Sequence, residues 1–554
     1  MVIPVRSPES EQAPDPSGSR SDSVASVILL TLAIGGAWIP VSSNPWTAVF
    51  VAASVLALVP WGWRRTGRTA FDWMVAGVVV LTVLTFSAMA GWDPSRAVGE
   101  IGLAAATGAL IWLSSRSRPP VVFPALLAAG LAVLAFWGIW QVATGLEAIR
   151  PGIEELALPA RAYAEERVAG RRAFASFPLP SHLAVMLATA LPLLLGQARR
   201  TLRGMIWIGF ALLAVVGLTM TQSPLGIGLA LVAVVPILVK KNRTVLRVLV
   251  GGLLVIMAAV IVVRPDVAAL EPVSLRIDNW RIGVWLWTTS PSSGVGVASF
   301  AQASQAVPLA VGNHPAHAHS LLFEGLAELG PVGLLGLLAL GGGLLRLIRS
   351  LWRENPGLAM AVAVVPLHNL VDFSLFVPGV ALPWAILVGW AAASRTPEIR
   401  PTATPSPRGR ALLVAAASGC LAMTVLQATG VLVEEASASS PESTIRFSGA
   451  MESLGMAPWR VKPQFLLASA AIESGDRLLQ DEAWGEIDRR RWIRPRSAAL
   501  AERRARLALA RGDVSSAMSE LWAAVRYGSR NSGSEEAIGE LLKALDGLDH
   551  DSAR

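Results

Sequence analysis

The sequence predicts an all-α protein that crosses a membrane many times and ends in a small helical domain. Hydrophobic residues make up 53% of its 554 residues and charged residues only 16%, whereas soluble chains carry about 25% charged residues. The mean hydropathy is +0.53. Apolar stretches of about 20 residues, enough to cross a bilayer, recur between residues 24 and 433. Charged residues concentrate after residue 440, which predicts a water-soluble region there.

We expect twelve to thirteen transmembrane helices, some of them short. The apolar stretches lie at residues 24–42, 45–62, 71–90, 98–115, 121–142, 179–197, 204–221, 224–239, 245–263, 331–349, 356–374, 378–394 and 411–433. The first 23 residues are rich in Pro and Ser and predict a disordered cytoplasmic tail. The predicted organisation is therefore a tail over 1–23, a transmembrane domain over 24–434 and a helical domain over 440–554.

Basic residues predict the orientation of these spans, because short cytoplasmic loops are enriched in Lys and Arg. Six connections that the alternation of spans places on one side are basic. They contain Arg64, Arg65, Arg68, Arg116, Arg118, Arg199, Arg200, Arg203, Lys240, Lys241, Arg243, Arg346, Arg349, Arg353, Arg395, Arg400, Arg408 and Arg410. The N-terminus is therefore expected inside, and the long loops 143–178 and 264–330, with the C-terminal domain, outside.

Charge and cysteine content exclude two other readings. The formal net charge of +8 comes largely from the short basic loops, so topology explains it and no nucleic-acid partner is expected. The single cysteine, Cys420, lies in an apolar stretch. A disulfide framework and a thiolate metal site are therefore ruled out.

Both long outer loops carry arginines on the side where the positive-inside rule disfavours them. The candidates for binding an anion at the membrane surface are Arg171, Arg172, Arg276 and Arg281. A guanidinium group suits phosphate because it is always charged and can donate two parallel hydrogen bonds. The tryptophans around Arg281, with Trp280 among them, are typical of a helix at the membrane interface. A plain interfacial anchor with snorkelling arginines is the alternative for this segment.

A polar motif precedes the apolar stretch at 331–349. Three histidines, His314, His317 and His319, lie close together, and His319-Ser320 is followed after nine residues by Gly330-Pro331-Val332-Gly333. This H-S-x9-G-x-x-G spacing resembles the signature of the O-antigen ligase and O-antigen polymerase superfamily. Those membrane enzymes move glycans from polyprenyl-diphosphate lipids.

Other segments between residues 70 and 395 are similar to recurrent elements of the same superfamily. An R-x-x-G-T-F-x-x-P-N element is matched by Arg172, Ala175, Ser176, Phe177 and Pro180, with Ala for Gly and Ser181 for Asn. The R-x-x-x-W and P-x-x-G-x-G-x-x-x-F elements are matched by Arg276, Trp280, Pro291, Gly294, Gly296 and Phe300. His368 and Asp372, expected on one face of a helix, resemble a further element. One departure is Ser223-Pro224-Leu225 in place of Ser-Arg-Gly, for which Arg171 is the candidate replacement.

The resemblance implies a fold like that of C-type glycosyltransferases. It also implies glycan transfer from an undecaprenyl-diphosphate carrier to a lipid or to a growing polysaccharide. His319 is the expected base for the acceptor hydroxyl, because histidine titrates near neutral pH. The four arginines are expected to bind the diphosphate and to stabilise the charge of the leaving group. Supporting roles are expected for His317, His314, Trp280, Gly330, Gly333, His368 and Asp372.

Neither a metal ion nor a cofactor is expected. The three histidines of the motif are the one candidate metal site, and no carboxylate or thiol lies close to them in the outer loop. The alternatives to a ligase are a repeat-unit polymerase of the same superfamily and a transporter of lipid-linked glycans or other solutes. Transporters place ionisable residues near the membrane midplane, whereas here they lie in the outer loops, which favours an enzyme of the bacterial cytoplasmic membrane.

The charged tail predicts helices that bind a protein partner. Residues 496–531 resemble one tetratricopeptide-type helix pair with Gly512-Asp513 in the turn. A second, degenerate copy ends at Asp476, about 37 residues earlier. Two imperfect repeats are fewer than a solenoid needs, so we expect them to pack against another helix or the membrane domain.

Overall fold

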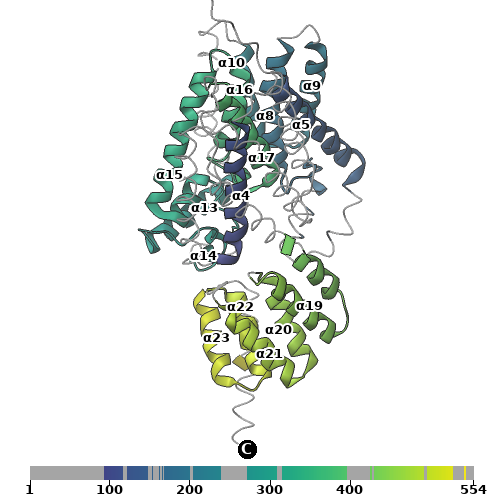
Figure 1. Cartoon of the computed structure of the whole chain (residues 1–554), viewed down its shortest axis with the longest axis vertical. Coiled ribbons are helices and arrows are strands. Elements are labelled where there is room, and N and C mark those ends of the chain that lie inside the picture. Colours follow the sequence, from purple (N-terminus) through teal and green to yellow (C-terminus); the bar gives the residue numbers. More distant parts are fainter. Residues whose placement is uncertain are drawn as a thin grey trace, which may run out of the picture.

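The computed structural model describes nine segments of the chain together with isolated positions outside them. The segments are 93–115, 122–146, 168–199, 204–238, 271–307, 315–395, 429–458, 460–491 and 496–527. All regular structure within them is helical (Figure 1). The predicted spans 24–42, 45–62, 71–90 and 245–263 lie outside the described residues, as do most of 411–433, the N-terminal tail, Cys420 and His314.

The first group of helices forms a bundle. It contains α4 (Pro94–Ser114), α5 (Phe123–Trp140) with a π-helical turn (Gln141–Gly145), α8 (Pro180–Ala198), α9 (Gly204–Met220), α10 (Pro224–Leu238), α13 (Glu271–Thr289), α14 (Phe300–Ser304), α15 (Leu321–Leu351), α16 (Pro356–His368), a 3-10 turn (Ser374–Phe376) and α17 (Pro378–Ala393). Helix α8 is central, since most of its residues are buried and it contacts α5, α9, α10 and α16. Small residues allow this close packing. A Cβ at Gly226, for example, would lie 2.4 Å from the Cβ of Ala184.

Three of the described helical stretches are long and apolar enough to cross a membrane. They are Phe123–Thr144, Pro180–Ala198 and Leu321–Leu351, and five shorter apolar helices accompany them. The apolar residues of α15 face outward, with Val332, Leu335 and Leu340 between 65% and 71% exposed. A lipid environment explains such a face, because soluble proteins rarely expose large apolar patches. Twelve to thirteen spans stay a prediction.

One of the predicted boundaries is wrong, and another coincides with a kink. Helix α15 begins at Leu321 but consists of two helices joined at Gly330, whose φ is 65° and ψ −158°, so its second part starts at the predicted residue 331. Helix α16 ends at His368 and not at 374. It stops there because Asn369 turns its side chain back to the carbonyl oxygen of Val365 and accepts the Leu375 N–H.

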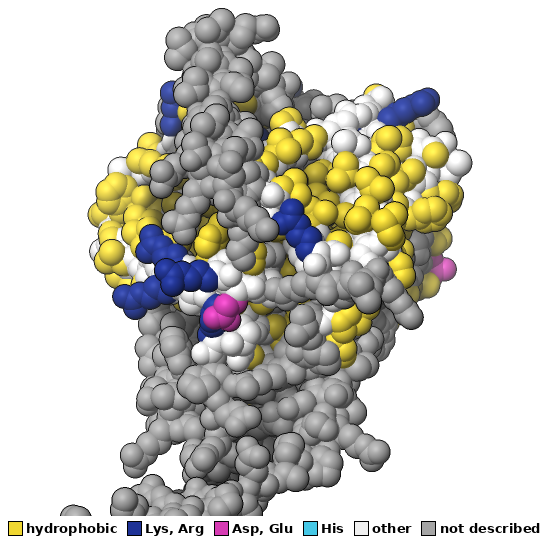
Figure 2. All heavy atoms as spheres, turned by 90° about the horizontal axis from the view of Figure 1, so that it is seen from above, with side chains coloured by type: hydrophobic (Ala, Val, Ile, Leu, Met, Phe, Trp, Pro, Cys, Tyr) yellow, Lys and Arg dark blue, Asp and Glu magenta, His cyan; other side chains and the backbone are white. Residues whose placement is uncertain are grey.

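The bundle has two chemically different ends. At one end Arg395 bonds to the carbonyl oxygen of Ser350 and pairs with Glu354 at 2.6 Å, and Arg199 bonds to the carbonyl oxygen of Ile237. Basic side chains, all of them arginines among the described residues of the bundle, lie beside apolar ones in the view onto this end (Figure 2). The opposite end carries α13, α14 and the beginning of α15, and it faces the C-terminal helices (Figure 1).

The second group of helices has an apolar core of its own. It contains α19 (Ser443–Met456), α20 (Lys462–Ser474), α21 (Arg477–Arg489), α22 (Ala498–Ala510) and α23 (Val514–Tyr527). The turns α20–α21 and α22–α23 are alike, because Gly475 and Gly512 take left-handed φ values of 67° and 71° and an Asp follows each. Asp476 caps α21 by accepting the Leu478 N–H at 2.8 Å. One contact to the bundle is a hydrogen bond from Gln302 of α14 to the carbonyl oxygen of Arg496.

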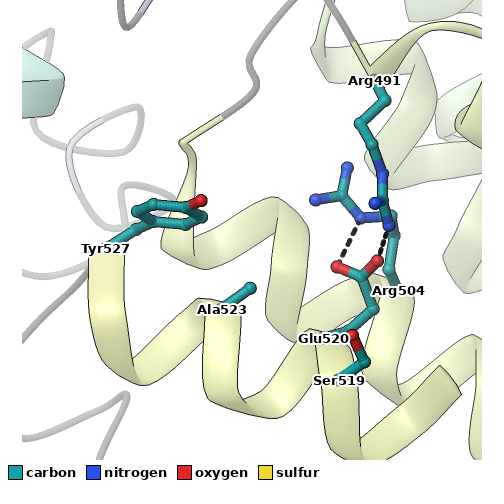
Figure 3. A pocket seen from close by; sticks show the side chains of 6 residues that line it. All are labelled: Arg491, Arg504, Ser519, Glu520, Ala523 and Tyr527. Atoms are coloured by element: carbon teal, nitrogen blue, oxygen red, sulfur yellow. Dashed lines mark hydrogen bonds and ion pairs between the residues drawn. The ribbon is translucent and has the colours of Figure 1, made fainter. Parts of the chain in front are cut away.

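Ion pairs close the last helix pair. A pocket of about 70 Å³ beside α23 is lined by Arg491, Arg504, Ser519, Glu520, Ala523 and Tyr527 (Figure 3). The Arg504 side chain is 3% exposed and its Nε lies 2.9 Å from Glu520, which also binds Arg491. Burial lowers the pKa of Arg504 to about 10, and the positive charge of Arg491 acts in the same direction. Glu520 therefore ties α22 and α23 to the end of α21.

Candidate functional site

The buried carboxylate of Asp372 is the centre of a polar cluster between α16 and α17. Its Oδ1 lies 3.7 Å from His319 Nδ1, and its Oδ2 lies 3.6 Å from His368 Nε2 and 3.9 Å from Arg276 Nη2. The Phe373 N–H donates to Asp372 Oδ1 at 2.7 Å. Three candidates that lie up to 92 positions apart in the chain (276 to 368) are thus brought to one carboxylate.

His319 reaches the surface of this cluster while Asp372 stays inside. The side chain of His319 is 29% exposed and that of Asp372 only 1%. His319 immediately precedes Ser320, the N-cap residue of α15, and has a left-handed φ of 53°. Such a conformation costs on the order of 1–3 kcal/mol for a residue with a Cβ and clusters at functional sites. The 3.7 Å separation is longer than a hydrogen bond, and His319 Nδ1 has no hydrogen-bond partner among the described residues, so Asp372 faces the imidazole as a nearby charge.

Arg276 comes from α13 and reaches the same carboxylate from the other side. Its side chain is 30% exposed, and its Nε is buried without a hydrogen-bond partner. The neighbouring Trp280 donates its Nε1–H to the carbonyl oxygen of His319 at 3.3 Å and stacks on Phe323. Helix α13 therefore places a guanidinium group and an aromatic ring beside His319.

His368 contacts Asp372, but not in the predicted way. Because α16 ends at His368, Asp372 lies beyond the helix and the two residues do not share a helical face. His368 Nδ1 lies 3.1 Å from the hydroxyl of Ser374. His368 is fully buried, so it meets Asp372 from inside the bundle.

Sequence reasoning missed His182, a third histidine of this cluster. It lies in the first turn of α8, is fully buried, and meets the ring of Phe373 edge-on at 5.1 Å. Neither of its ring nitrogens has a hydrogen-bond partner. The sequence did offer an indication, because His182 directly follows Pro180-Ser181, the end of the segment that matches the R-x-x-G-T-F-x-x-P-N element.

The charge state of Asp372 follows from these neighbours. Burial by itself raises the pKa of the Asp372 carboxyl, but the nearby imidazoles of His319, His368 and His182 oppose that effect. The net pKa lies below the usual aspartate range. Asp372 is therefore a carboxylate at neutral pH and can stabilise a positive charge on His319.

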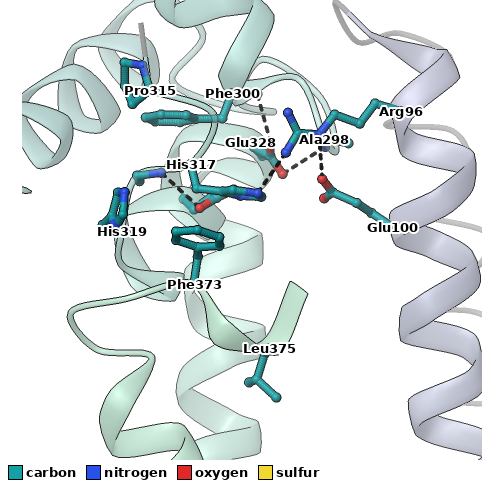
Figure 4. Close-up of polar contacts among 12 residues, drawn as sticks. Arg96, Glu100, Ala298, Phe300, Pro315, His317, His319, Glu328, Phe373 and Leu375 are labelled. Carbon is teal, nitrogen blue, oxygen red and sulfur yellow. Dashed lines mark hydrogen bonds and ion pairs between the residues drawn. The ribbon is translucent and has the colours of Figure 1, made fainter. Parts of the chain in front are cut away.

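A second network holds His317 away from Asp372. His317 Nδ1 lies 2.7 Å from Glu324, and its Nε2 lies 2.9 Å from Arg96, which pairs with Glu100 at 3.0 Å (Figure 4). Phe373 separates the two networks, because its ring stacks on His317 at 4.4 Å and meets His319 edge-on at 4.8 Å. Arg96, Glu100 and Glu324 were not among the residues predicted from the sequence.

The predicted glycines shape the backbone around these networks. At Gly330 a Cβ would lie 3.0 Å from the carbonyl oxygen of Ser292, in a conformation that disfavours side chains. At Gly333 a Cβ would come within 2.2 Å of Leu329. Two residues before Gly330, the Glu328 carboxylate accepts hydrogen bonds from the N–H groups of Ala298 and Phe300, both at 2.9 Å. These contacts fasten residues 294–300 onto α15.

The remaining predicted arginines are not joined to the Asp372 cluster by any described contact. Arg172 donates its Nε–H to the carbonyl oxygen of Thr221 at 3.2 Å, at the end of α9. The neighbouring Arg171 is exposed and has a left-handed φ of 47°. Arg281 is 70% exposed and pairs with Asp278 at 3.1 Å. Arg276 is thus the predicted arginine that the structure places beside His319.

No metal-binding arrangement is found in the part of the chain that the structure describes, where no group of three or more His, Cys, Asp or Glu side chains could hold a metal ion. His314 lies outside those residues.

A scan of the chain against models of protein families gives no match, and a search of curated proteins gives none either. The resemblance to the O-antigen ligase superfamily therefore depends on the motif residues alone.

Proposed function

We propose that this protein is a polytopic membrane glycosyltransferase that moves a glycan from an undecaprenyl-diphosphate carrier to an acceptor, as O-antigen ligases do. The observation that carries the proposal is the contact of His319 and Arg276 with the buried carboxylate of Asp372. A base for the acceptor hydroxyl and a cation for the diphosphate then lie side by side. Glycan transfer from a lipid diphosphate needs both groups within reach of one reacting bond.

In this proposal the acceptor hydroxyl loses its proton to His319 as its oxygen attacks the anomeric carbon. The bond between that carbon and the diphosphate oxygen breaks, and the diphosphate leaves with the bonding electrons. Arg276 stabilises the negative charge that develops there. Asp372 stabilises the positive charge that His319 acquires.

The test is transfer by the purified protein alongside binding of a polyprenyl-diphosphate analogue. His319→Ala should lower transfer by about 10²–10⁴, because a positioned base contributes that much, and should leave analogue binding nearly unchanged. Wild-type transfer by His319→Ala would exclude the proposed base. Normal analogue binding by Arg276→Ala would remove the diphosphate site and favour a transporter.

The glycan that accumulates in a deletion strain distinguishes a ligase from a polymerase and from a transporter. Full-length glycan accumulating unattached in a deletion strain would indicate a ligase, and single unlinked repeat units would indicate a polymerase. Donor retained inside the cell would indicate a transporter.

We further propose a bacterial cytoplasmic membrane location with the Asp372 cluster and the C-terminal helices outside. The basic end of the bundle supports this orientation, since Arg is enriched in cytoplasmic loops. After Cys420 is replaced, cysteines at the exposed positions Ser292, Ser350 and Ser515 can be labelled with an impermeant thiol reagent. Ser292→Cys and Ser515→Cys should react in intact spheroplasts, and Ser350→Cys only after lysis. Reaction of Ser350→Cys from outside would reverse the orientation.

A further inference from the structure

A second polar network lies beside the Asp372 cluster and has no part in the chemistry proposed above. The His317 network consists of Arg96, Glu100, His317 and Glu324 (Figure 4). It joins the first turns of α4 and α15 across 221 positions of sequence, and it contacts the segment that carries His319.

The partners of His317 determine where its ring proton lies. Arg96 Nη2 lies 2.9 Å from His317 Nε2, and a guanidinium group can only donate, so Nε2 is the acceptor. Nδ1 lies 2.7 Å from Glu324 Oε1, and a carboxylate accepts, so Nδ1 is the donor. A proton on Nε2 would face an Arg96 N–H and abolish that hydrogen bond. The contacts thus specify a neutral ring protonated on Nδ1.

Glu324 also holds the backbone next to His319. Its second oxygen accepts the Ala318 N–H at 3.1 Å, while Trp280 donates to the carbonyl oxygen of His319 at 3.3 Å. The backbone is therefore anchored at the His317–Ala318 peptide group and at the His319–Ser320 peptide group, which lie on either side of the Ala318–His319 peptide group. This explains how His319 keeps an unfavourable φ of 53°, because strained residues persist only where their surroundings hold them.

We infer that His317 and Glu324 are positioning residues that hold the His319 segment, and that His317 is not an alternative base. The inference rests on the proposed transferase function for the role of His319. The tautomer of His317 can be measured without that function. Arg96 contributes to this positioning because it determines the tautomer of His317. Glu100 in turn holds Arg96 through an ion pair of 3.0 Å between Glu100 Oε1 and Arg96 Nε.

Matched substitutions separate positioning from base catalysis. His317→Asn keeps an N–H donor near the place of Nδ1, whereas His317→Gln places its amide near Nε2, and His317→Ala keeps neither. Positioning predicts that Asn stays within about threefold of wild-type kcat, while Gln and Ala lose roughly ten- to a hundredfold, the cost of leaving buried polar groups unpaired. The donor KM and the pH profile should not change in any of them.

Glu324→Gln tests the carboxylate that contacts both the His317 ring and the Ala318 N–H. A Gln amide offers one acceptor and one donor end, so it cannot accept from both His317 and Ala318. We expect roughly a ten- to hundredfold lower kcat. Glu354→Gln, at the opposite end of the bundle and 72% exposed, is the control and should behave as wild type. Melting temperatures in the same detergent identify variants that fail to fold.

The tautomer is measured directly by ¹⁵N NMR of histidine-labelled full-length protein, with the His317 signals assigned by their loss in His317→Asn. One protonated and one unprotonated nitrogen, with the proton on Nδ1, are expected at neutral pH, and Arg96→Gln should release this tautomer. A proton on Nε2, or equal losses in His317→Asn and His317→Ala with a shifted pH profile, would overturn the inference. If the wild-type protein transferred no glycan, the proposed function would fail, and the NMR result would still decide the tautomer.

Discussion

Two segments of the bundle supply arginines, residues 168–179 (the first segment) and residues 271–330 (the second segment), but their arginines make different contacts. In the second segment Arg276 lies beside a buried carboxylate and keeps an unpaired Nε. In the first segment Arg172 uses its Nε–H on a backbone carbonyl of α9. In the proposed transferase the second segment would therefore supply the charges for chemistry, whereas the first is fastened to the end of α9.

The backbone of the two segments shows the same difference. Ala175 in the first segment has a left-handed φ of 50°, and Gln141 accepts its N–H at 2.7 Å and donates to its carbonyl oxygen at 2.9 Å. The corresponding clamps in the second segment are the carboxylates Glu324 and Glu328, both buried. A neutral amide therefore shapes the first segment, and ionisable groups shape the second.

Replacing Asp372 should have the largest effect. Asp372→Asn removes the charge that faces Arg276 and three histidines, so transfer should fall by about 10²–10⁴. The substitution also leaves Arg276 without its ion-pair partner, which should lower the stability. Transfer within a few-fold of wild type would place the chemistry elsewhere and favour the first segment.

The pH dependence of that stability loss provides a check. Because the folded-state pKa of Asp372 is lowered, its stabilising contribution is present above its unfolded pKa, about 3.9. The contribution is lost as the pH falls through the lower folded value. The difference in melting temperature between wild type and Asp372→Asn should therefore shrink as the pH falls below about 4, where the carboxyl of the unfolded chain becomes protonated.

The arginines should rank in the order of their placement. Arg276→Ala should weaken binding of a polyprenyl-diphosphate analogue roughly ten- to a hundredfold, the range for hydrogen bonds to charged groups. Arg172→Ala should cost less, about three- to tenfold, because one donor is already engaged. Arg276→Lys should recover only part of the loss, since the forked geometry is gone. Binding measured by calorimetry that ranked Arg172 first would reverse the comparison of the two segments.

The glycine kink of α15 should matter for stability in the second segment. Gly330→Ala forces a side chain into a backbone conformation, φ 65° and ψ −158°, that essentially only glycine adopts, at a cost on the order of 1–3 kcal/mol, and its Cβ would also crowd Ser292. Gly336→Ala on the same helix is the control. A Cβ there meets nothing within 4 Å, so helix propensity should stabilise it by up to about 1 kcal/mol. Equal melting temperatures for the two variants would contradict the role of the kink.

The smallest effect is expected in the first segment. Ala175→Gly replaces a left-handed alanine by the residue that adopts this conformation most readily, so stability should stay unchanged or rise by up to about 1 kcal/mol. Ala173→Gly is the matched change at a fully buried neighbour without positive φ, and it should destabilise. Thermal melting of both variants compares them, and a loss at Ala175 as large as at Ala173 would disprove the conformational explanation.

The sequence by itself determined the helical class, the apolar stretches of the bundle and several members of the Asp372 cluster. These features are local, because a span needs only a run of apolar residues and the motifs are short patterns. His319, Arg276, His368 and Asp372 could be named in this way. Ala175 was named as standing where the resembled motif has glycine, but its left-handed φ of 50° became apparent only in the structure.

Only the tertiary structure decided which candidates meet. Arg96 lies 221 positions from His317, and no local pattern indicates that a first-turn arginine of α4 fixes the tautomer of a histidine before α15. His182 looked like an ordinary residue of an apolar helix until Phe373 and Asp372 were packed beside it. Even the end of α16 depended on Asn369, whose side chain replaces the next helical turn by bonds to Val365 and Leu375. Polar contacts of this kind arise where helix ends converge, and that convergence is set by the packing of the whole bundle.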